Sequence, residues 1–124
     1  MKNSLLGIGI IGVGGVCHYG HFPAMEQAHG ARLAALCDVN RETCEAHAKL
    51  HRVPAFYCDY RELLADPNVD AVIIATPNYL HKPIAIAALE AGKHALCEKP
   101  LALNAPDSAD VVDAARRANR KLMV

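Results

Sequence analysis

Short apolar runs alternate along this chain with segments that carry polar residues at helical spacing. The runs are four to seven residues long, and they occupy Leu5–Ile11, Arg32–Cys37, Ala55–Cys58, Ala71–Ala75, His94–Cys97 and Lys121–Val124. The run at 71–75 has no polar position, as expected of a strand that is buried on both faces. Regular alternation of strand and helix predicts an α/β protein with a parallel sheet.

The first helix is predicted from near Gly15 and the second from Arg41. Pro23 has no backbone N–H, so the first helix should bend or restart at 21–24. Asn40 can cap the second helix, which should run to about Leu50.

Three further helices follow from capping and turn residues. Residues 59–62 resemble a capping box that opens a short helix, a helix over 79–91 ends at Gly92, and Asn104 caps a last helix to about Asn119. Apolar positions at helical spacing should face the sheet: Leu80, Ile84, Ala87, Ala88 and Ala91 in one helix, and Val111, Ala115 and Ala118 in the other.

Right-handed crossovers place six such strands in the order 3-2-1-4-5-6, which is a Rossmann-type doubly wound parallel sheet. Ligands bind such sheets beyond the carboxyl ends of the strands, at the point where the strand order reverses. The segments at those ends are Gly12–Cys17, Asp38, Thr76–Asn78 and Glu98–Pro100. We expect them to converge on one crevice.

The turn after the first strand is rich in glycine. Gly12 lets the chain turn sharply, and Gly14 removes the Cβ that would keep a pyrophosphate away from the backbone. The third glycine of the usual fingerprint is replaced by Cys17, which is still small, and Asp38 can accept hydrogen bonds from an adenosine ribose. The pattern predicts a dinucleotide site, rather than a glycine turn without phosphate, formed by Gly12, Gly14, Gly15, Val16, Cys17 and Asp38.

The charge of Asp38 bears on the choice of cofactor. A carboxylate would repel the 2′-phosphate of NADP, so the sequence favours NAD. Arg41 follows three residues later and could pair with such a phosphate, which leaves NADP as the alternative.

Composition and charge exclude several function classes. The formal net charge of +0 and the lack of a basic run argue against nucleic acid or an anionic membrane as partner. The 5 cysteines lack a CxxC spacing, which suits reduced thiols of a cytoplasmic protein better than disulfides or zinc. The 7 histidines show no helical pair facing a carboxylate, so we predict no metal and a small molecule as partner.

The N-terminus allows one alternative. Met1 and Lys2, followed by an apolar stretch up to Cys17, could pass for a lipoprotein signal, but Val16 stands where such a signal has a small residue. A first strand explains the same stretch, and no other segment approaches the length of a membrane span. We therefore predict no membrane attachment.

The chain also resembles a known family, the glucose-fructose oxidoreductase, inositol dehydrogenase and rhizopine-catabolism (Gfo/Idh/MocA) group of NAD(P)-dependent oxidoreductases. The specific motifs are Ala75-Thr76-Pro77-Asn78 and Glu98-Lys99-Pro100, and further matching segments are 12–15, 21–24, 37–38, 70–81, 88–94 and 97–101. Together they extend over the whole chain, so residues 1–124 are predicted to be one dinucleotide-binding Rossmann domain. The departures from the family pattern are Cys17 and the missing second half.

The resemblance implies that Lys99 is the catalytic residue and also lies beside the nicotinamide. There it would assist proton transfer from the hydroxyl that is oxidised, and Glu98 would help to orient the site. A lysine among apolar neighbours and next to a cationic nicotinamide can have its pKa lowered towards the working pH, which makes it a usable proton acceptor. The simpler alternative for Lys99 is a surface lysine after a strand. In the family, the peptide bond that matches Lys99–Pro100 is often cis.

The resemblance places Thr76, Pro77 and Asn78 beside the nicotinamide ribose. The alternative is an ordinary strand exit in which Asn78 caps the next helix. His21 and His81 could each reach the crevice, but both are interpreted more simply as exposed helix histidines.

Members of the family are longer and carry a second α/β domain with the substrate-binding wall. Because this chain ends within a predicted strand, we expect a cut cofactor domain of a dehydrogenase that acts on a sugar, inositol or related polyol. Alone, it should bind cofactor without turnover and self-associate through apolar surface left uncovered. The alternatives are a free-standing dinucleotide-binding sensor or partner module, and a Rossmann fold whose site is dead.

Overall fold

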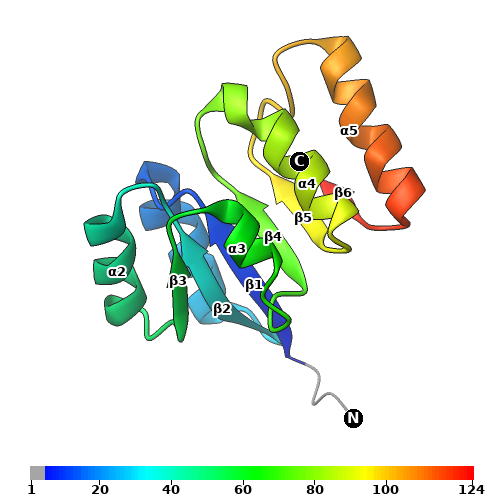
Figure 1. Cartoon of the computed structure of the whole chain (residues 1–124). Coiled ribbons are helices and arrows are strands. Elements are labelled where there is room, and N and C mark those ends of the chain that lie inside the picture. The colour runs from blue at the N-terminus through cyan, green and yellow to red at the C-terminus, as the bar shows by residue number, and fades with distance from the viewer. Residues whose placement is uncertain (1–4) are drawn as a thin grey trace.

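The sheet has the predicted strand order. A computed structural model describes residues 5–124; Met1 and Lys2, on which the lipoprotein alternative rests, lie outside the described residues. Six strands pair in parallel in the order β3-β2-β1-β4-β5-β6 (Figure 1). They are β1 (Leu6–Ile11), β2 (Ala31–Cys37), β3 (Ala55–Tyr57), β4 (Ala71–Ile74), β5 (His94–Cys97) and β6 (Leu122–Met123). The α/β class and the doubly wound order are therefore confirmed.

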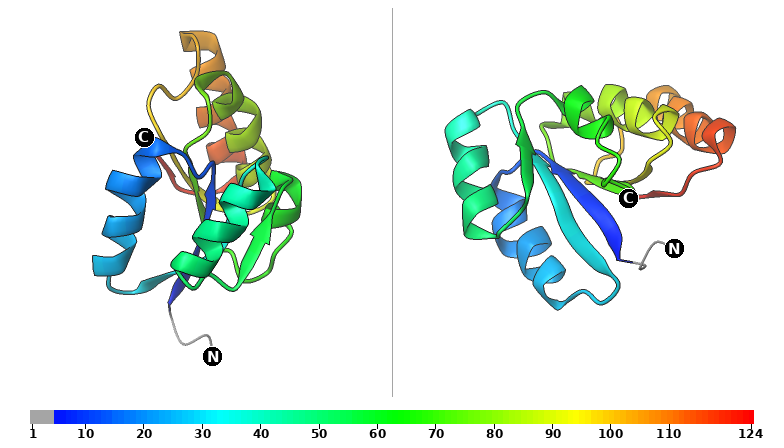
Figure 2. Two further views of the ribbon diagram at one scale, coloured as in Figure 1. Left: turned by 90° about the vertical axis from the view of Figure 1, so that its left-hand side faces the viewer. Right: turned by 60° about the horizontal axis from the view of Figure 1, so that its bottom comes forward.

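Helices cover the sheet in two layers, one on each face (Figure 2). One layer consists of the π-helical turn η1 (Cys17–His21), α1 (Phe22–Gln27) and α2 (Arg41–Leu50). The other consists of α3 (Tyr60–Leu64), the 3₁₀ turn η2 (Asn78–Leu80), α4 (His81–Glu90) and α5 (Ala105–Ala118). Each layer buries its own apolar cluster against the sheet. Within residues 5–124, no helix has the length and apolar character needed to cross a membrane.

The helix after β1 changes its winding close to Pro23. It begins at Gly15, widens into η1, and continues as α1 from Phe22, whose N–H donates to the carbonyl of Cys17 five residues earlier. Proline clashes with the carbonyl four residues before it and has no N–H to donate, and a π-turn accommodates both. The restart predicted at 21–24 is confirmed, as a widening of the helix rather than a break.

The helix after β4 starts later than predicted. Residues 78–80 form a 3₁₀ turn, so α4 begins at His81 rather than at Tyr79, and the Asn78 side chain does not cap it. The buried face shifts accordingly: Ile84 and Ala88 are buried as predicted, whereas Ala91 is exposed. The buried positions that the prediction missed are His81, Ala85 and Leu89.

Side-chain caps open three of the helices. Asn40 accepts from the N–H of Thr43 at the start of α2, and Asn104 accepts from that of Asp107 at the start of α5, as predicted. Asp59 caps α3 through the N–H of Arg61, two residues on. A capping box would use the N–H of the third residue, so the predicted box is replaced by this simpler cap.

All five cysteines are free, and four of them are buried. Burial raises the pKa of the Cys37 thiol to about 12 and those of Cys17, Cys44 and Cys97 to about 11. Cys58 is only half-buried. Because the thiolate is the reactive form of cysteine, the four buried thiols should be chemically inert in the folded chain.

We predict that a thiol reagent such as Ellman's modifies one thiol per folded chain, at Cys58, and all five only after unfolding. Absorbance of the released thiolate counts the modified groups. Cys58→Ser should remove the rapid phase, whereas Cys44→Ser, the buried control, should leave it unchanged. Rapid modification of any thiol in the folded Cys58→Ser chain would contradict the burial of the other four cysteines.

Three histidines gather around the buried ring of Phe22, between the first helix and α2. Phe22 stacks on His51 with 3.9 Å between the ring centroids, and His47 lies 4.6 Å from His18 and 5.9 Å from His51. Burial lowers the pKa of His47 from its ordinary value of 6.5, and the nearby His18 and His51 lower it further, against a smaller opposing effect of Asp38. The folded chain therefore resists protonation of His47.

This resistance predicts that the chain loses stability in mild acid. Well above pH 6.5 His47 is neutral in both states and contributes no pH dependence. As the pH falls below 6.5, the unfolded chain takes up a proton that the folded chain resists, so the free energy of unfolding decreases. Urea melts on both sides of pH 6.5 measure this slope. His47→Leu should flatten it, and the matched surface variant His29→Gln should not; equal slopes in both variants would refute the assignment.

Candidate functional site

Backbone hydrogen bonds hold the carboxyl ends of the strands side by side. The N–H of Asp38 donates to Tyr57, and that of Gly12 donates to Cys37. On the other side of β1, the N–H of Ala75 donates to Ile11, and that of Glu98 donates to Ile74. The segments predicted to converge, Gly12–Cys17, Asp38, Thr76–Asn78 and Glu98–Pro100, therefore follow one another along one edge of the sheet.

The glycine turn packs tightly on one side and is open on the other. Gly12 has φ +95°, and a Cβ there would lie 2.7 Å from the backbone of Ala75 and 2.9 Å from the nitrogen of Thr76. Gly14 has nothing within 4 Å of the position of a Cβ. The helix that starts at Gly15 leaves its first N–H groups without helical partners. Open space over free N–H groups fits a phosphate of the predicted dinucleotide.

Cys17 fills the position of the missing third glycine. It is fully buried, and its thiol donates a hydrogen bond to the carbonyl of Gly12 over 3.1 Å. Its pKa of about 11 results mainly from burial, with the negative charges of Glu98 and Asp38 adding to the effect. The thiol therefore closes the turn as a neutral, small packing group, consistent with the tolerance expected at this position.

Asp38 is half-buried at the end of β2 and is already tied to the backbone. One carboxylate oxygen accepts the N–H of Val13 over 2.9 Å, and the other accepts that of Asn40 over 2.9 Å. Each oxygen keeps a further lone pair for a ligand hydroxyl. Arg41 does not reach this carboxylate; its guanidinium lies over the ring of Phe56, 5.2 Å from the centroid.

The strand exit at 76–78 carries a polar atom without a partner. The Thr76 hydroxyl oxygen is buried and has no hydrogen bond to any described residue. Pro77 and Asn78 are exposed, and Asn78 begins the 3₁₀ turn rather than capping α4. A buried hydroxyl without a partner costs free energy, so a polar ligand at this edge would satisfy it.

Glu98, Lys99 and Pro100 follow β5 at the same edge. The Lys99–Pro100 bond is cis, and Lys99 is exposed rather than surrounded by apolar neighbours. A Glu98 carboxylate oxygen lies 3.6 Å from the Nε2 atom of His21, the last residue of η1. His21 is thus half-buried at the crevice and pairs with Glu98 when protonated, in contrast to the simpler interpretation as an exposed histidine.

His81 also differs from the exposed helix histidine that the sequence suggests. Its side chain is 1% exposed and both ring nitrogens face backbone carbonyls: Nδ1 lies 2.7 Å from the oxygen of Pro100, and Nε2 lies 3.0 Å from that of Thr76. The sequence carries a signal for this position. His81 shares the helical spacing of Ile84, Ala85 and Ala88. When α4 is taken to begin at His81, its apolar face therefore includes this histidine.

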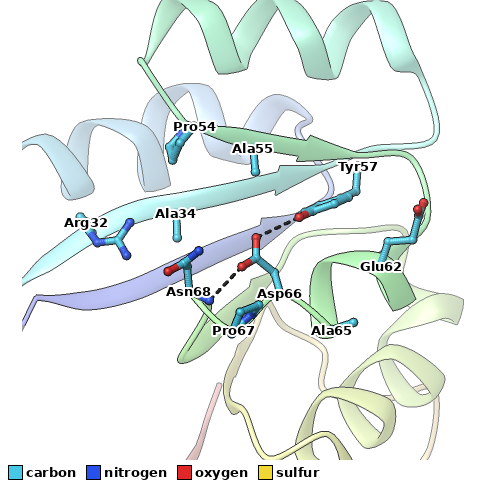
Figure 3. Close-up of a pocket in the computed structure, with 10 residues that line it drawn as sticks. All are labelled: Arg32, Ala34, Pro54, Ala55, Tyr57, Glu62, Ala65, Asp66, Pro67 and Asn68. Carbon is cyan, nitrogen blue, oxygen red and sulfur yellow. Dashed lines mark hydrogen bonds between the residues drawn. The ribbon is translucent and has the colours of Figure 1, made fainter. Parts of the chain in front are cut away.

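A separate hollow of about 570 Å³ lies on the α3 side of β2 and β3 (Figure 3). Because α3 has only 5 residues, it leaves part of this face uncovered. Across the hollow, the hydroxyl of Tyr57 donates to the buried Asp66, whose other oxygen accepts the N–H of Asn68. None of the predicted site residues lines it. No group of three or more potential metal ligands occurs within residues 5–124.

Known proteins resemble the chain over nearly its whole length. The family described as the oxidoreductase family with an NAD-binding Rossmann fold (Gfo/Idh/MocA) matches residues 6–124. An uncharacterised oxidoreductase from Rhizobium meliloti is 38% identical over 118 residues, which are 95% of this chain and 35% of that protein. A 1,5-anhydro-D-fructose reductase from Ensifer adhaerens is 39% identical over 92 residues, which are 74% of this chain and 28% of the reductase.

Solved structures agree with this match. An NAD-binding oxidoreductase from Klebsiella pneumoniae has a TM-score of 0.85 and 40% identity, covering 97% of this chain and 34% of its own. The WlbA dehydrogenase from Chromobacterium violaceum, in complex with NADH and UDP-GlcNAcA, has a TM-score of 0.89 and 29% identity, covering 98% and 35%. A variant of KijD10, a 3-ketoreductase from Actinomadura kijaniata, in complex with TDP-benzene and NADP, has a TM-score of 0.91 and 28% identity, covering 96% and 36%.

The chain spans about a third of the length of these proteins, and in the solved structures the matched part has this same fold. The match over residues 6–124, together with the glycine turn and the two strand exits, shows that the chain belongs to the Gfo/Idh/MocA family of oxidoreductases and has its NAD-binding Rossmann fold.

Proposed function

We propose that residues 1–124 are the cofactor domain of a dehydrogenase that moves a hydride between a nicotinamide dinucleotide and a hydroxyl or carbonyl of a sugar, inositol or related polyol. One observation carries the proposal: the glycine turn is open above Gly14, and the next residue back, Val13, is tied to the carboxylate of Asp38. A phosphate site and a ribose acceptor are thereby held at a fixed separation. This pairing is what a dinucleotide requires of a Rossmann fold.

The environment of Asp38 supports NAD as the cofactor. Its carboxylate would repel a 2′-phosphate, and Arg41, the nearby cation that could offset this, lies over Phe56. The relatives include one protein solved with NADH and another solved with NADP, so the family alone leaves the choice open. The preference for NAD therefore rests on the charge of Asp38.

Lys99 is proposed to hold and transfer the proton of the reaction at its Nζ atom. The nicotinamide, when bound, supplies the hydride acceptor or donor. Lys99 is exposed at the carboxyl edge of the sheet, between Glu98 and Pro100, which both have contacts to other elements. Its ammonium group can give a proton to a carbonyl oxygen, and its amine can take one from a hydroxyl. The sugar reductase among the relatives supports this substrate class for the parent enzyme.

A second candidate function is dinucleotide binding without turnover, as a sensor or partner module. The exposure of Lys99 is compatible with it, because chemistry that must exclude water needs a surrounding wall, which residues 5–124 do not form around Lys99. Both candidates require the same cofactor site. Self-association of the isolated chain stays a prediction from the sequence.

We predict that the purified chain binds NADH more tightly than NADPH. Asp38→Ala should lower the affinity ratio of NADH to NADPH by about tenfold, since it removes ribose hydrogen bonds and the repulsion of the 2′-phosphate together. Calorimetric titration measures both affinities. Asp38→Asn, which keeps the shape and removes the charge, should move the ratio in the same direction. An unchanged ratio in both variants would reject NAD as the preferred cofactor.

Gly14→Ala provides a steric test of the same site. A Cβ at Gly14 meets nothing within 4 Å, so the folded chain should tolerate it, but the methyl group would occupy the approach of a pyrophosphate. We expect an unchanged melting temperature and a loss of at least about tenfold in NADH affinity. Gly20→Ala is the matched control, because it adds the same methyl group within η1 rather than in the glycine turn, in ordinary contact with Val16 at 3.9 Å. Full NADH affinity in Gly14→Ala would place the dinucleotide elsewhere.

A further inference from the structure

Two segments that end neighbouring strands converge on the ring of His81. The carbonyl of Thr76 follows β4, the carbonyl of Pro100 follows β5, and the ring lies against both at 3.0 Å and 2.7 Å. The ring is 1% exposed, so water cannot readily replace it as the partner of either carbonyl. We propose that His81 is a positioning residue that couples these two segments and thereby sets the nicotinamide half of the cofactor site, an inference that rests on the proposed dinucleotide function.

The ring of His81 contacts two backbone carbonyls, those of Thr76 and Pro100. It can therefore set the distance between the two backbone segments. Both partners are carbonyl oxygens, which only accept, so an imidazolium donates to both, whereas a neutral imidazole donates to one and packs its other nitrogen against the second. Pairing of the parallel strands does not fix the segments beyond their ends, because the last hydrogen bonds between β4 and β5 end at Ile74 and Glu98. Beyond that point, His81 supplies the cross-link between Thr76 and Pro100.

The segment that carries Lys99 is held on both sides by histidines from opposite layers of the fold. Glu98 faces His21 of η1 at 3.6 Å, and Pro100 faces His81 of α4. Lys99 lies between these two anchored residues, yet its own side chain is exposed. The residues on both sides of Lys99 therefore contact other elements, while its Nζ stays available to a ligand.

Only the nicotinamide half of a bound dinucleotide should depend on the contacts of His81 with Thr76 and Pro100. The glycine turn and Asp38 lie on β1 and β2, on the adenosine side of the point where the strand order reverses. Thr76 and Lys99 follow β4 and β5, on the opposite side. A ligand that contains only the adenosine diphosphate portion should therefore bind without help from His81, whereas NADH should not.

The test compares NADH and ADP as calorimetric ligands of the chain. We expect the wild-type chain to bind NADH more tightly than ADP. His81→Phe should lower the affinity for NADH by about tenfold, while the affinity for ADP stays within about twofold of the wild-type value. A residue that merely supported the fold would lower both affinities together. Ile84→Ala is the matched control, since it removes buried volume from the same face of α4 without touching either carbonyl, and it should leave the NADH:ADP ratio unchanged.

If His81→Phe does not fold, His81→Asn replaces it in the test, because its amide can still donate to one of the two carbonyls. His81→Asn should also lose NADH affinity relative to ADP, by a smaller factor than His81→Phe. Circular dichroism verifies folding. Unchanged NADH affinity in a folded His81 variant, or an equal loss for NADH and ADP, would overturn the inference while leaving the proposed function intact. Failure of the wild-type chain to bind either ligand would overturn the proposed function, and this inference with it.

Discussion

The site depends on the close contact between the turn after β1 and the exit from β4. Gly12 can make this contact because it has no Cβ, and any side chain there would overlap the backbone of Ala75 and Thr76. A parallel sheet places all its carboxyl ends at one edge, but the contact at Gly12 brings the two halves of that edge together. The phosphate turn and the candidate nicotinamide segment are thus positioned by backbone packing, which tolerates little movement.

Asp38 connects this contact to the adenosine side. Its carboxylate accepts the N–H groups of Val13 and Asn40, so it links the glycine turn to the start of α2 before any ligand binds. The same charge serves as the proposed ribose acceptor. A change at Asp38 therefore affects the turn and the ligand together, and only the discrimination between the two cofactors isolates the ligand effect, because distortion of the turn weakens both cofactors alike.

The sequence predicted the sheet order and every strand, because apolar runs and capping residues are local signals. It also predicted the restart of the first helix, since Pro23 acts on its own backbone. It failed where the outcome depended on tertiary contacts. The start of α4 is shifted by the 3₁₀ turn at 78–80, and His81 is buried against the carbonyl of Pro100, which lies 19 residues further along the chain and gives no local signal. The pairing of His21 with Glu98 is missed for the same reason.

His21 and His81, which the sequence suggested to be exposed, share a physical feature. A buried imidazole is a costly way to fill an apolar core, where leucine would bury more apolar area without a polar atom to satisfy. His81 offsets part of that cost at the carbonyls of Thr76 and Pro100, whereas the Nε2 atom of His21 is buried without a hydrogen bond, 3.6 Å from the Glu98 carboxylate. The Thr76 hydroxyl at the same edge has no partner among the described residues. Buried polar groups are costly for stability, and here they gather around residues 98–100. Such local departures from apolar packing are expected at functional sites, where the geometry of the segment matters more than its stability.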